Sequence, residues 1–297
     1  MVVSDSGQHS NQSSVNMAIN IRDIDFFKRQ AVAIINVTDD SFYADSRTTT
    51  VETIEQRTEQ VVAEGASIID IGGYSSRPDA ADIPLDEEWR RVQRGISAIR
   101  NVSATAPISV DTFRSEIIRR TVEEFGDVIV NDISAGELDD NMVDVVSHYD
   151  LPYVMMHMRG TPQTMQNLTC YDDVSSEVCR YLRDRGEAMV ERGVRRERII
   201  LDPGFGFAKS VEQNFRLLAD LNYLVELEYP VLVGLSRKSM IYKTLNSTPE
   251  DVASAVQPLH WEALRQGATL LRTHDVLDTV RTIELFNKFN TISDDNL

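Results

Sequence analysis

The feature that most constrains this fold is an alternation, repeated eight times, between short apolar runs and longer amphipathic segments. The apolar runs are rich in β-branched residues and are continuous rather than alternating, as is typical of parallel strands covered on both faces. They span Ala31–Val37, Ser67–Gly73, Pro107–Thr112, Val128–Asp132, Leu151–Met158, Ile199–Gly204, Pro230–Ser236 and Ala268–Asp275. Eight such units in a chain of 297 residues predict an α/β fold, a closed (β/α)8 TIM barrel in a single domain.

The segments between the apolar runs predict helices. They span Val51–Glu64, Asp86–Ala104, Glu116–Phe125, Asp173–Arg192, Val211–Leu227, Asp251–Arg265 and Val276–Phe289. A glycine, the residue that most easily adopts the left-handed conformation of a helix end, stands before several strands, at Gly65, Gly126, Gly193 and Gly267. The alternative fold is an open doubly wound sheet. That fold usually carries a G-x-G-x-x-G or Walker A motif, and the chain has neither.

Composition limits the partners and the location. A net charge of −17 argues against nucleic acid, which needs a basic face. The two cysteines, Cys170 and Cys179, have no metal-ligand spacing and predict free thiols in a reducing cytoplasm. No apolar run approaches the ~18 residues of a membrane span, so no membrane is expected. The polar first 20 residues predict a disordered tail ahead of a barrel domain over residues 21–292.

Polar residues stand where the predicted strands end, and in a barrel these ends face one shared pocket. In chain order they are Asn36, Asp70, Asp111, Asn131, Asp132, His157, Asp202, Ser236, Arg237, Lys238, Arg272 and His274. Asp111, Asn131 and Asp202 suit the edge of a flat heterocycle that bears N–H donors. Lys238, Arg272 and His274 supply the local cations that a small anionic substrate needs.

Some of these signals have a plain structural alternative. The stretch LDPGFGFAK, from Leu201 to Lys209, ends a strand in a carboxylate, and Asp-Pro-Gly is also good turn chemistry. The long loops after the first two strands predict function, although Arg77 and Arg159 could be solvated surface arginines. Lys238 and Ser239 lie where a helix begins, which is either an anion site or a simple helix cap.

These residues lie in segments that resemble the dihydropteroate synthase family. The similarity covers roughly Ala31 to Phe289. It is carried by the segments NVTDDSF, IIDIGGYSSRP, SVDTFR, VNDISAG, VMMHMRGTPQTMQ, ILDPGFGFAKSVEQNFRLL, VLVGLSRKSM and LRTHDV, in the order of the family. The family has the TIM-barrel fold and condenses 7,8-dihydropterin-6-ylmethyl diphosphate with 4-aminobenzoate in folate biosynthesis. The resemblance therefore implies a transferase.

The resemblance also implies a role for each matching position. Residues that hold or shape the pterin slot are Asp111, Asn131, Ile133, Met156, Asp202, Phe207, Gly234 and Lys238. The diphosphate site is Arg272, His274, Asn36 and Ser76, with Asn36 also a ligand of Mg²⁺. The residues that frame the aminobenzoate are Phe42, Arg77, Pro78 and Ser239. Of these, Lys238, Arg77, Arg272 and His274 are expected to be the catalytic residues.

Partners and departures from the family pattern follow from the same comparison. The family implies a homodimer through the last helices and makes the chain a sulfonamide target. Asp39 stands where many members have Pro, which affects closure of the first loop, and Asp79 and Ala135 replace common glycines. Two alternatives stay open: a pterin-binding paralogue without turnover, and a pterin-dependent methyltransferase of the same barrel family.

Overall fold

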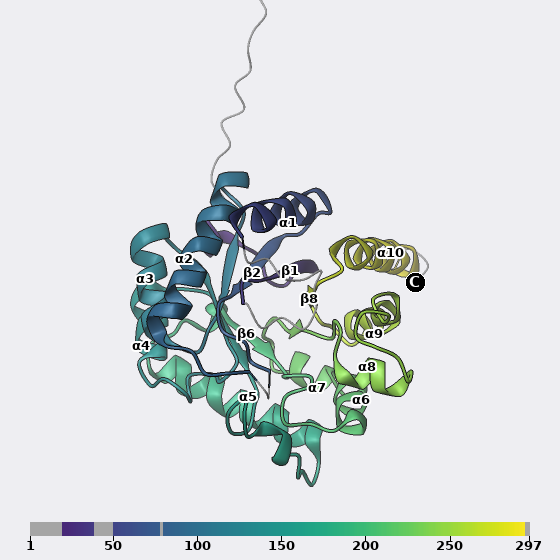
Figure 1. Cartoon of the computed structure of the whole chain (residues 1–297). Helices are drawn as coiled ribbons and strands as arrows, with labels where there is room; N and C mark the ends of the chain where they lie inside the picture. The colour runs from purple at the N-terminus through teal and green to yellow at the C-terminus, as the bar shows by residue number, and fades with distance from the viewer. Residues whose placement is uncertain (1–19, 39–49, 78–79, 295–297) are drawn as a thin grey trace, which may run out of the picture.

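The computed structural model describes residues 20–38, 50–77 and 80–294, and it forms one parallel eight-stranded barrel (Figure 1). The expected tail at the N-terminus lies almost entirely outside the described residues. The strands are β1 (Gln30–Asn36), β2 (Ile68–Gly72), β3 (Ile108–Asp111), β4 (Ile129–Asp132), β5 (Tyr153–Met156), β6 (Ile199–Asp202), β7 (Leu232–Val233) and β8 (Leu270–Thr273). All the paired strands run parallel, in the order β6-β5-β4-β3-β2-β1-β8-β7.

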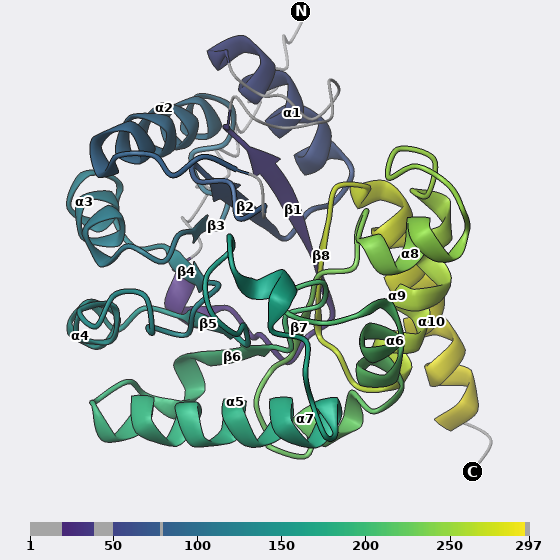
Figure 2. The ribbon, with the colours of Figure 1, turned by 60° about the horizontal axis from the view of Figure 1, so that its bottom comes forward.

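A parallel bridge between Leu201 and Val231 joins the two ends of this order and closes the ring. The TIM barrel is therefore confirmed, and the open-sheet alternative is wrong. Figure 2 looks into the ring of strands, with the helices arranged around it. The helices are α1 (Val51–Ala63), α2 (Leu85–Val102), α3 (Ser115–Phe125), α4 (Met142–Tyr149), α5 (Val174–Glu191), α6 (Val211–Ala219), α7 (Asn222–Val225), α8 (Ser239–Thr244), α9 (Gln257–Arg265) and α10 (Val276–Asp294).

Three helices differ from the expectation. The single helix expected over Val211–Leu227 is divided into α6 and α7 at Asp220, whose carboxylate accepts a hydrogen bond from Ser175 of α5 at 2.8 Å. The helix α4 was not predicted. The helix expected from Asp251 begins as α9 only at Gln257, where Pro258 fits the first turn because that turn needs no N–H donor from it.

The side chains inside the ring form layers, because alternate residues of each strand point inward. An apolar layer lies near the beginning of the strands and consists of Val32, Ile68, Ile129, Val154, Ile200, Leu232 and Leu270. Ile21 of the 3-10 helix η1 (Ile21–Asp23) and Phe26 pack against this layer. Two residues further along the strands, Asp70, Asn131, Asp202 and Arg272 occupy the next inward positions. The sequence thus places a layer of polar and charged side chains directly after an apolar layer along the strands.

No helix within the described ranges combines the length and apolar character needed to cross a membrane.

Candidate active site

One cavity of about 1170 Å³ opens at the carboxyl ends of the strands. It gathers every residue of the predicted site that the structure describes. These are Asn36, Ser76, Arg77, Asp111, Asn131, Ile133, Met156, Asp202, Phe207, Gly234, Lys238, Ser239, Arg272 and His274. Phe42 and Pro78 lie outside the described residues, as do Asp39 and Asp79. Each strand of the ring, or the loop that follows it, contributes to this set, which is therefore assembled by barrel closure.

The floor of the cavity is a network of charges centred on Arg272 of β8. Its guanidinium donates to Asp70 Oδ2 at 2.6 Å and to Asp111 Oδ2 at 2.8 Å. Asn131 Nδ2 donates to Asp70 Oδ1 at 3.2 Å. Asp70 is 1% exposed and does not line the cavity, so it orients Arg272 and Asn131 without facing the cavity itself. Asp111 and Asn131 are left facing the cavity with the heteroatoms that a ligand edge would meet.

The loop after β6 brings Phe207 back over this floor. Asp202 Oδ1 accepts a hydrogen bond from the backbone N–H of Gly204 at 2.7 Å, and Gly204 and Gly206 have φ of 70° and 80°. Phe207 is 9% exposed, and Lys238 Nζ lies 4.3 Å from the centre of its ring. A Cβ on Gly206 would lie 3.0 Å from Lys238 Cδ. The glycine therefore makes room for the lysine to cross the loop.

The buried side chain of Lys209 contacts the same loop on the side away from the cavity. Lys209 is 5% exposed, and its ammonium lies 2.9 Å from His157 Nδ1. It donates to the carbonyl oxygens of Gly204 and Phe207, both at 3.0 Å. Burial lowers the pKa of Lys209 to about 7, although Asp202 acts in the opposite direction. Lys209 thus connects the loop to the end of β5.

Burial also shifts the pKa values of the groups that line the cavity. It raises the pKa of Asp111 to about 7 against the attraction of Arg272, and it raises the pKa of Asp202 against the hydrogen bond from Gly204. It lowers the pKa of Lys238 to about 8, with Arg272 adding to the shift. The pKa values of Asp111 and Lys238 therefore lie near neutral pH. A ligand that pairs with their charged forms would move both values back toward the usual ones.

His274 corrects one expectation about local cations. Burial, together with the nearby cations Arg237 and Arg272, lowers the pKa of His274 well below its usual value. Its Nδ1 lies 3.1 Å from Ser236 Oγ. These surroundings favour the neutral form of the His274 imidazole in the ligand-free site, and a bound anion would act in the opposite direction. Arg272 remains charged, because Asp70 and Asp111 raise its pKa despite its burial.

Besides Asp70, three polar residues singled out at or beside strand ends do not line the cavity. Asp132 accepts hydrogen bonds from Ser134, the Gly136 N–H and Tyr153 Oη, and so holds the turn in which Ala135 has φ of 50°. His157 contacts Lys209, and its ring lies edge-on to Tyr181. Each follows an inward residue of its strand and therefore faces the helices. Arg159 stacks on Tyr171 at 3.7 Å and pairs with Glu177, which favours the structural alternative.

Several lining residues were not predicted, notably Tyr74, Gln166, Arg237, Tyr242 and Lys243. Arg237 was singled out at a strand end but given no role, and it has φ of 58°. Tyr74 and Gln166 lie within two segments that carry the family resemblance, IIDIGGYSSRP and VMMHMRGTPQTMQ, and this position was the sequence feature that could have identified them. Tyr242 and Lys243 belong to the short helix α8, whose start at Ser239 confirms the expected helix beginning.

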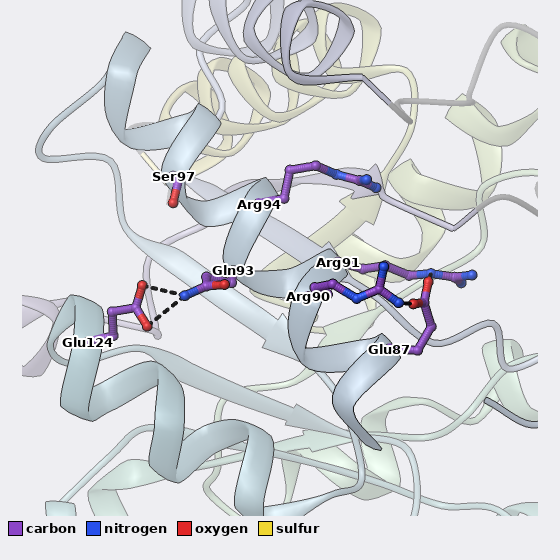
Figure 3. Close-up of a pocket in the computed structure, with 7 residues that line it drawn as sticks. All are labelled: Glu87, Arg90, Arg91, Gln93, Arg94, Ser97 and Glu124. Carbon is purple, nitrogen blue, oxygen red and sulfur yellow. Dashed lines mark hydrogen bonds and ion pairs between the residues drawn. The ribbon is translucent and has the colours of Figure 1, made fainter. Parts of the chain in front are cut away.

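A second hollow lies on the outside of the barrel between α2 and α3 (Figure 3). Its lining is polar and consists of Glu87, Arg90, Arg91, Gln93, Arg94, Ser97 and Glu124. Figure 3 shows Gln93 joined to Glu124, and Arg91 and Arg94 extending in the other direction. Arg90 and Arg91 both pair with Glu87. Arg90 and Arg91 share one carboxylate, whereas Arg94 Nε is buried with no hydrogen-bond partner among the described residues, so this hollow is a helix surface that is only partly ion-paired.

Magnesium fits the main cavity only as a partner of a phosphate ligand. Among the described residues, no cluster of three or more His, Cys, Asp or Glu could hold a metal ion. Asn36 lines the cavity and offers one amide oxygen. Mg²⁺ typically keeps several waters and binds through one or two protein oxygens plus substrate phosphates. The donor set is compatible with that mode of binding.

Comparison with known proteins agrees with this geometry. Residues 32–274 match the family described as pterin binding enzyme. The chain is 40% identical over 254 residues to dihydropteroate synthase of Synechocystis sp.. The matched stretch covers 85% of this chain and 87% of that protein. The chain belongs to the dihydropteroate synthase family. The structures of this family place the match over the whole barrel, as two examples illustrate.

Dihydropteroate synthase from Xanthomonas albilineans in complex with 7,8-dihydropteroate has a TM-score of 0.79 and 36% identity. That similarity covers 90% of this chain and 95% of the Xanthomonas chain. The Yersinia pestis dihydropteroate synthase, solved as a sulfonamide drug complex, has a TM-score of 0.86 and 32% identity, over 93% and 100% of the two chains.

Proposed function

We propose that this protein is a dihydropteroate synthase, a transferase that condenses 7,8-dihydropterin-6-ylmethyl diphosphate with 4-aminobenzoate. The products are 7,8-dihydropteroate and diphosphate, in folate biosynthesis. The observation that carries the proposal is that Asp111, Asn131 and Asp202 line the same cavity as Lys238 and Arg272. Carboxylate and amide acceptors recognise the pterin edge, and the cations recognise the diphosphate.

The pterin would bind between the floor and Phe207. The carboxylate of Asp202 would accept hydrogen bonds from two donors of the aminopyrimidinone edge, and Asp111 and Asn131 would serve the rest of the ring. A buried carboxylate is costly unless it is hydrogen-bonded, so a ligand with matching N–H groups offsets the desolvation that raises the pKa of both aspartates. Recognition of the pterin thus uses groups that are otherwise poorly solvated.

The reaction would proceed largely by dissociation. The C–O bond between the pterin methylene and diphosphate breaks, and the leaving group takes the electron pair. Arg272 would stabilise the negative charge on the diphosphate, and Asp111 and Asp202 would favour the positive charge on the pterin. The amine nitrogen of 4-aminobenzoate then attacks the methylene carbon and releases its extra proton to water or diphosphate.

Magnesium would assist the departure of diphosphate. Asn36 would hold the ion together with diphosphate oxygens, and the ion would supply further charge neutralisation of the leaving group. Arg77, Pro78 and Ser239, with Phe42, would position the arylamine. Because 4-aminobenzoate is neutral at its nitrogen near pH 7, positioning and electrostatics are expected to do most of the work.

We also propose a homodimer through α10, a cytoplasmic location and binding of sulfonamides at the aminobenzoate site. Leu285, Phe289 and Ile292 of α10 are 66%, 59% and 52% exposed, and their spacing places them on one helix face. The two free cysteines support a reducing compartment.

The deciding experiment is product formation from pterin diphosphate, 4-aminobenzoate and Mg²⁺, with diphosphate release followed in parallel. Dihydropteroate that appears only with Mg²⁺ supports the proposal. Tight binding of pterin diphosphate without product would instead indicate the paralogue that binds without turnover. Methyl transfer to a corrinoid partner, with no dihydropteroate formed, would identify the methyltransferase alternative.

A further inference from the structure

A fully buried carboxylate lies outside the cavity, in the first turn of α2. Glu88 is 0% exposed and does not line the cavity. Its Oε1 accepts a hydrogen bond from Thr112 Oγ1 at 2.6 Å, and its Oε2 accepts one from Arg114 Nη1 at 2.9 Å. Burial raises the pKa of Glu88, and both partners act against that shift. A buried carboxylate is tolerated only when it is paired in this way, so Glu88 sets the position of Arg114.

The other face of the Arg114 guanidinium reaches the loop after β2. Its Nη2 donates to the carbonyl oxygen of Ile83 at 2.9 Å and to Asp82 Oδ1 at 3.1 Å. The guanidinium also lies 5.2 Å from the ring centre of Tyr74, which packs edge-on against Phe113 at 5.1 Å. Arg114 therefore contacts both ends of the segment that runs from Tyr74 to Ile83.

This segment carries cavity residues between the two points of contact. Ser76 and Arg77 line the cavity, and Ala80 N–H donates to the carbonyl oxygen of Arg77 at 3.1 Å. Thr112, the other partner of Glu88, directly follows Asp111 of the cavity floor. Neither Glu88, Thr112 nor Arg114 lines the cavity. One network thus connects the floor to the loop, although Glu88, Thr112 and Arg114 themselves stay outside the cavity lining.

We propose that Arg114, oriented by Glu88, is a positioning residue that holds Tyr74 and residues 82–83, the two ends of the loop after β2, and thereby sets the affinity for the arylamine substrate. This inference rests on the proposed function, because the loop serves the arylamine only in that reaction. When only part of the population has the loop in place, the apparent affinity falls by that fraction. Binding of pterin diphosphate depends mainly on the floor, to which the loop adds only Ser76, and should be affected far less.

The test compares Arg114→Met with a matched control at an exposed arginine. Arg119→Met removes a side chain that pairs only with Glu116 and Glu123 of α3. In Arg114→Met we expect the KM for 4-aminobenzoate to rise roughly tenfold, while the KM for pterin diphosphate changes less than about twofold. Arg114→Lys, which keeps the charge but loses the forked contact, should be intermediate. Arg119→Met should match the unmodified protein.

A second readout does not depend on activity. Amide hydrogen exchange over residues 74–84 should be faster in Arg114→Met than in Arg119→Met, with the strands unchanged. If exchange over these residues is the same in both variants, the inference is overturned, whether or not the unmodified protein forms product. Absence of product from the unmodified protein would contradict the proposed function instead. Equal rises in both KM values also overturn it. If Arg114→Met fails to fold, Glu88→Gln must show the same selective rise, and its absence overturns the inference.

Discussion

At the scale of single residues, Lys209 is a buried amine whose protonated form finds a partner for each N–H, and it lies beside the site without lining it. Its ammonium has three N–H groups and three acceptors, namely His157 Nδ1 and the carbonyl oxygens of Gly204 and Phe207. Burial and the neighbouring Lys209 lower the pKa of His157 to about 2, so the imidazole is neutral and Nδ1 accepts. Lys209 can therefore stay buried as a structural link.

Two substitutions of His157 separate this acceptor from the bulk of the ring. His157→Asn keeps an acceptor near the position of Nδ1, whereas His157→Leu leaves one donor of Lys209 unsatisfied. We expect His157→Leu to be less stable than His157→Asn by about 1–3 kcal/mol, the usual cost of a buried unpaired polar group. Urea unfolding measures the difference, and equal stability of the two variants would show that the contact contributes nothing.

Replacement of Arg77 should affect turnover more than the binding of pterin diphosphate. It lines the cavity beside Ser76, on the loop that would position the arylamine. Arg77→Ala should lower kcat by roughly 10–100-fold, a typical effect of lost positioning, and should leave the affinity for pterin diphosphate nearly unchanged. Steady-state kinetics and calorimetry give the two quantities. Equal losses in both would refute this division of roles.

Asp111 makes stability depend on pH. Its folded pKa of about 7 lies above the unfolded value of 3.8, so its contribution is fully present below that lower value and is lost as the pH rises through about 7. From about pH 5 to about pH 8, the unfolding free energy of the ligand-free protein should fall by roughly 1–3 kcal/mol relative to that of Asp111→Asn. Urea unfolding across this range checks the sign, and parallel curves would contradict it.

At the scale of elements, the loop after β6 depends on a close backbone approach. A Cβ on Gly204 would lie 2.0 Å from the carbonyl oxygen of His157, and Gly204 also has φ of 70°. Gly126, at the end of α3, has a similar φ of 86°, but a Cβ added there would have no neighbour within 4 Å among the described residues. The two glycines therefore share the backbone requirement and differ in the available space.

This difference predicts unequal costs of adding a methyl group. Gly126→Ala should lose about 1–3 kcal/mol, because its φ of 86° and ψ of −166° form a conformation that essentially only glycine adopts. Gly204→Ala should lose at least about 2 kcal/mol more, because the loop and the end of β5 must move apart. Thermal and urea unfolding compare the two variants. Similar losses would mean that the loop after β6 adapts freely.

At the scale of the whole molecule, the exposed apolar face of α10 is the candidate dimer surface. Phe289 also packs against Trp261 of α9, with the ring centres 5.8 Å apart. The double substitution Leu285→Asp and Phe289→Asp should weaken self-association at least roughly tenfold, because charges in the centre of an interface are strongly unfavourable. Sedimentation measures this. Val190→Asp, at an exposed position of α5 that is 41% accessible, is the control.

Much of this molecule could be predicted from local patterns. Apart from Gln30, which begins β1, each strand lies within one of the predicted apolar runs, and Gly65, Gly126, Gly193 and Gly267 all have positive φ, as expected of helix ends. Boundaries were less predictable: α6 ends at Ala219, and the next residue, Asp220, accepts a hydrogen bond from Ser175 of α5, 45 positions away. Such contacts exist only after the helices have packed.

The sequence by itself determined the order of strands and helices, the polar residues near the strand ends and the family, because these depend on neighbours along the chain. Only the tertiary structure decided which of those residues share the cavity. Strand alternation turns Asp202 inward and His157 outward, and closure of the ring brings Arg272 onto Asp70 and Asp111 from strands far apart in the chain. Burial then decides their charge, because the water that would solvate each group has been replaced by particular neighbours.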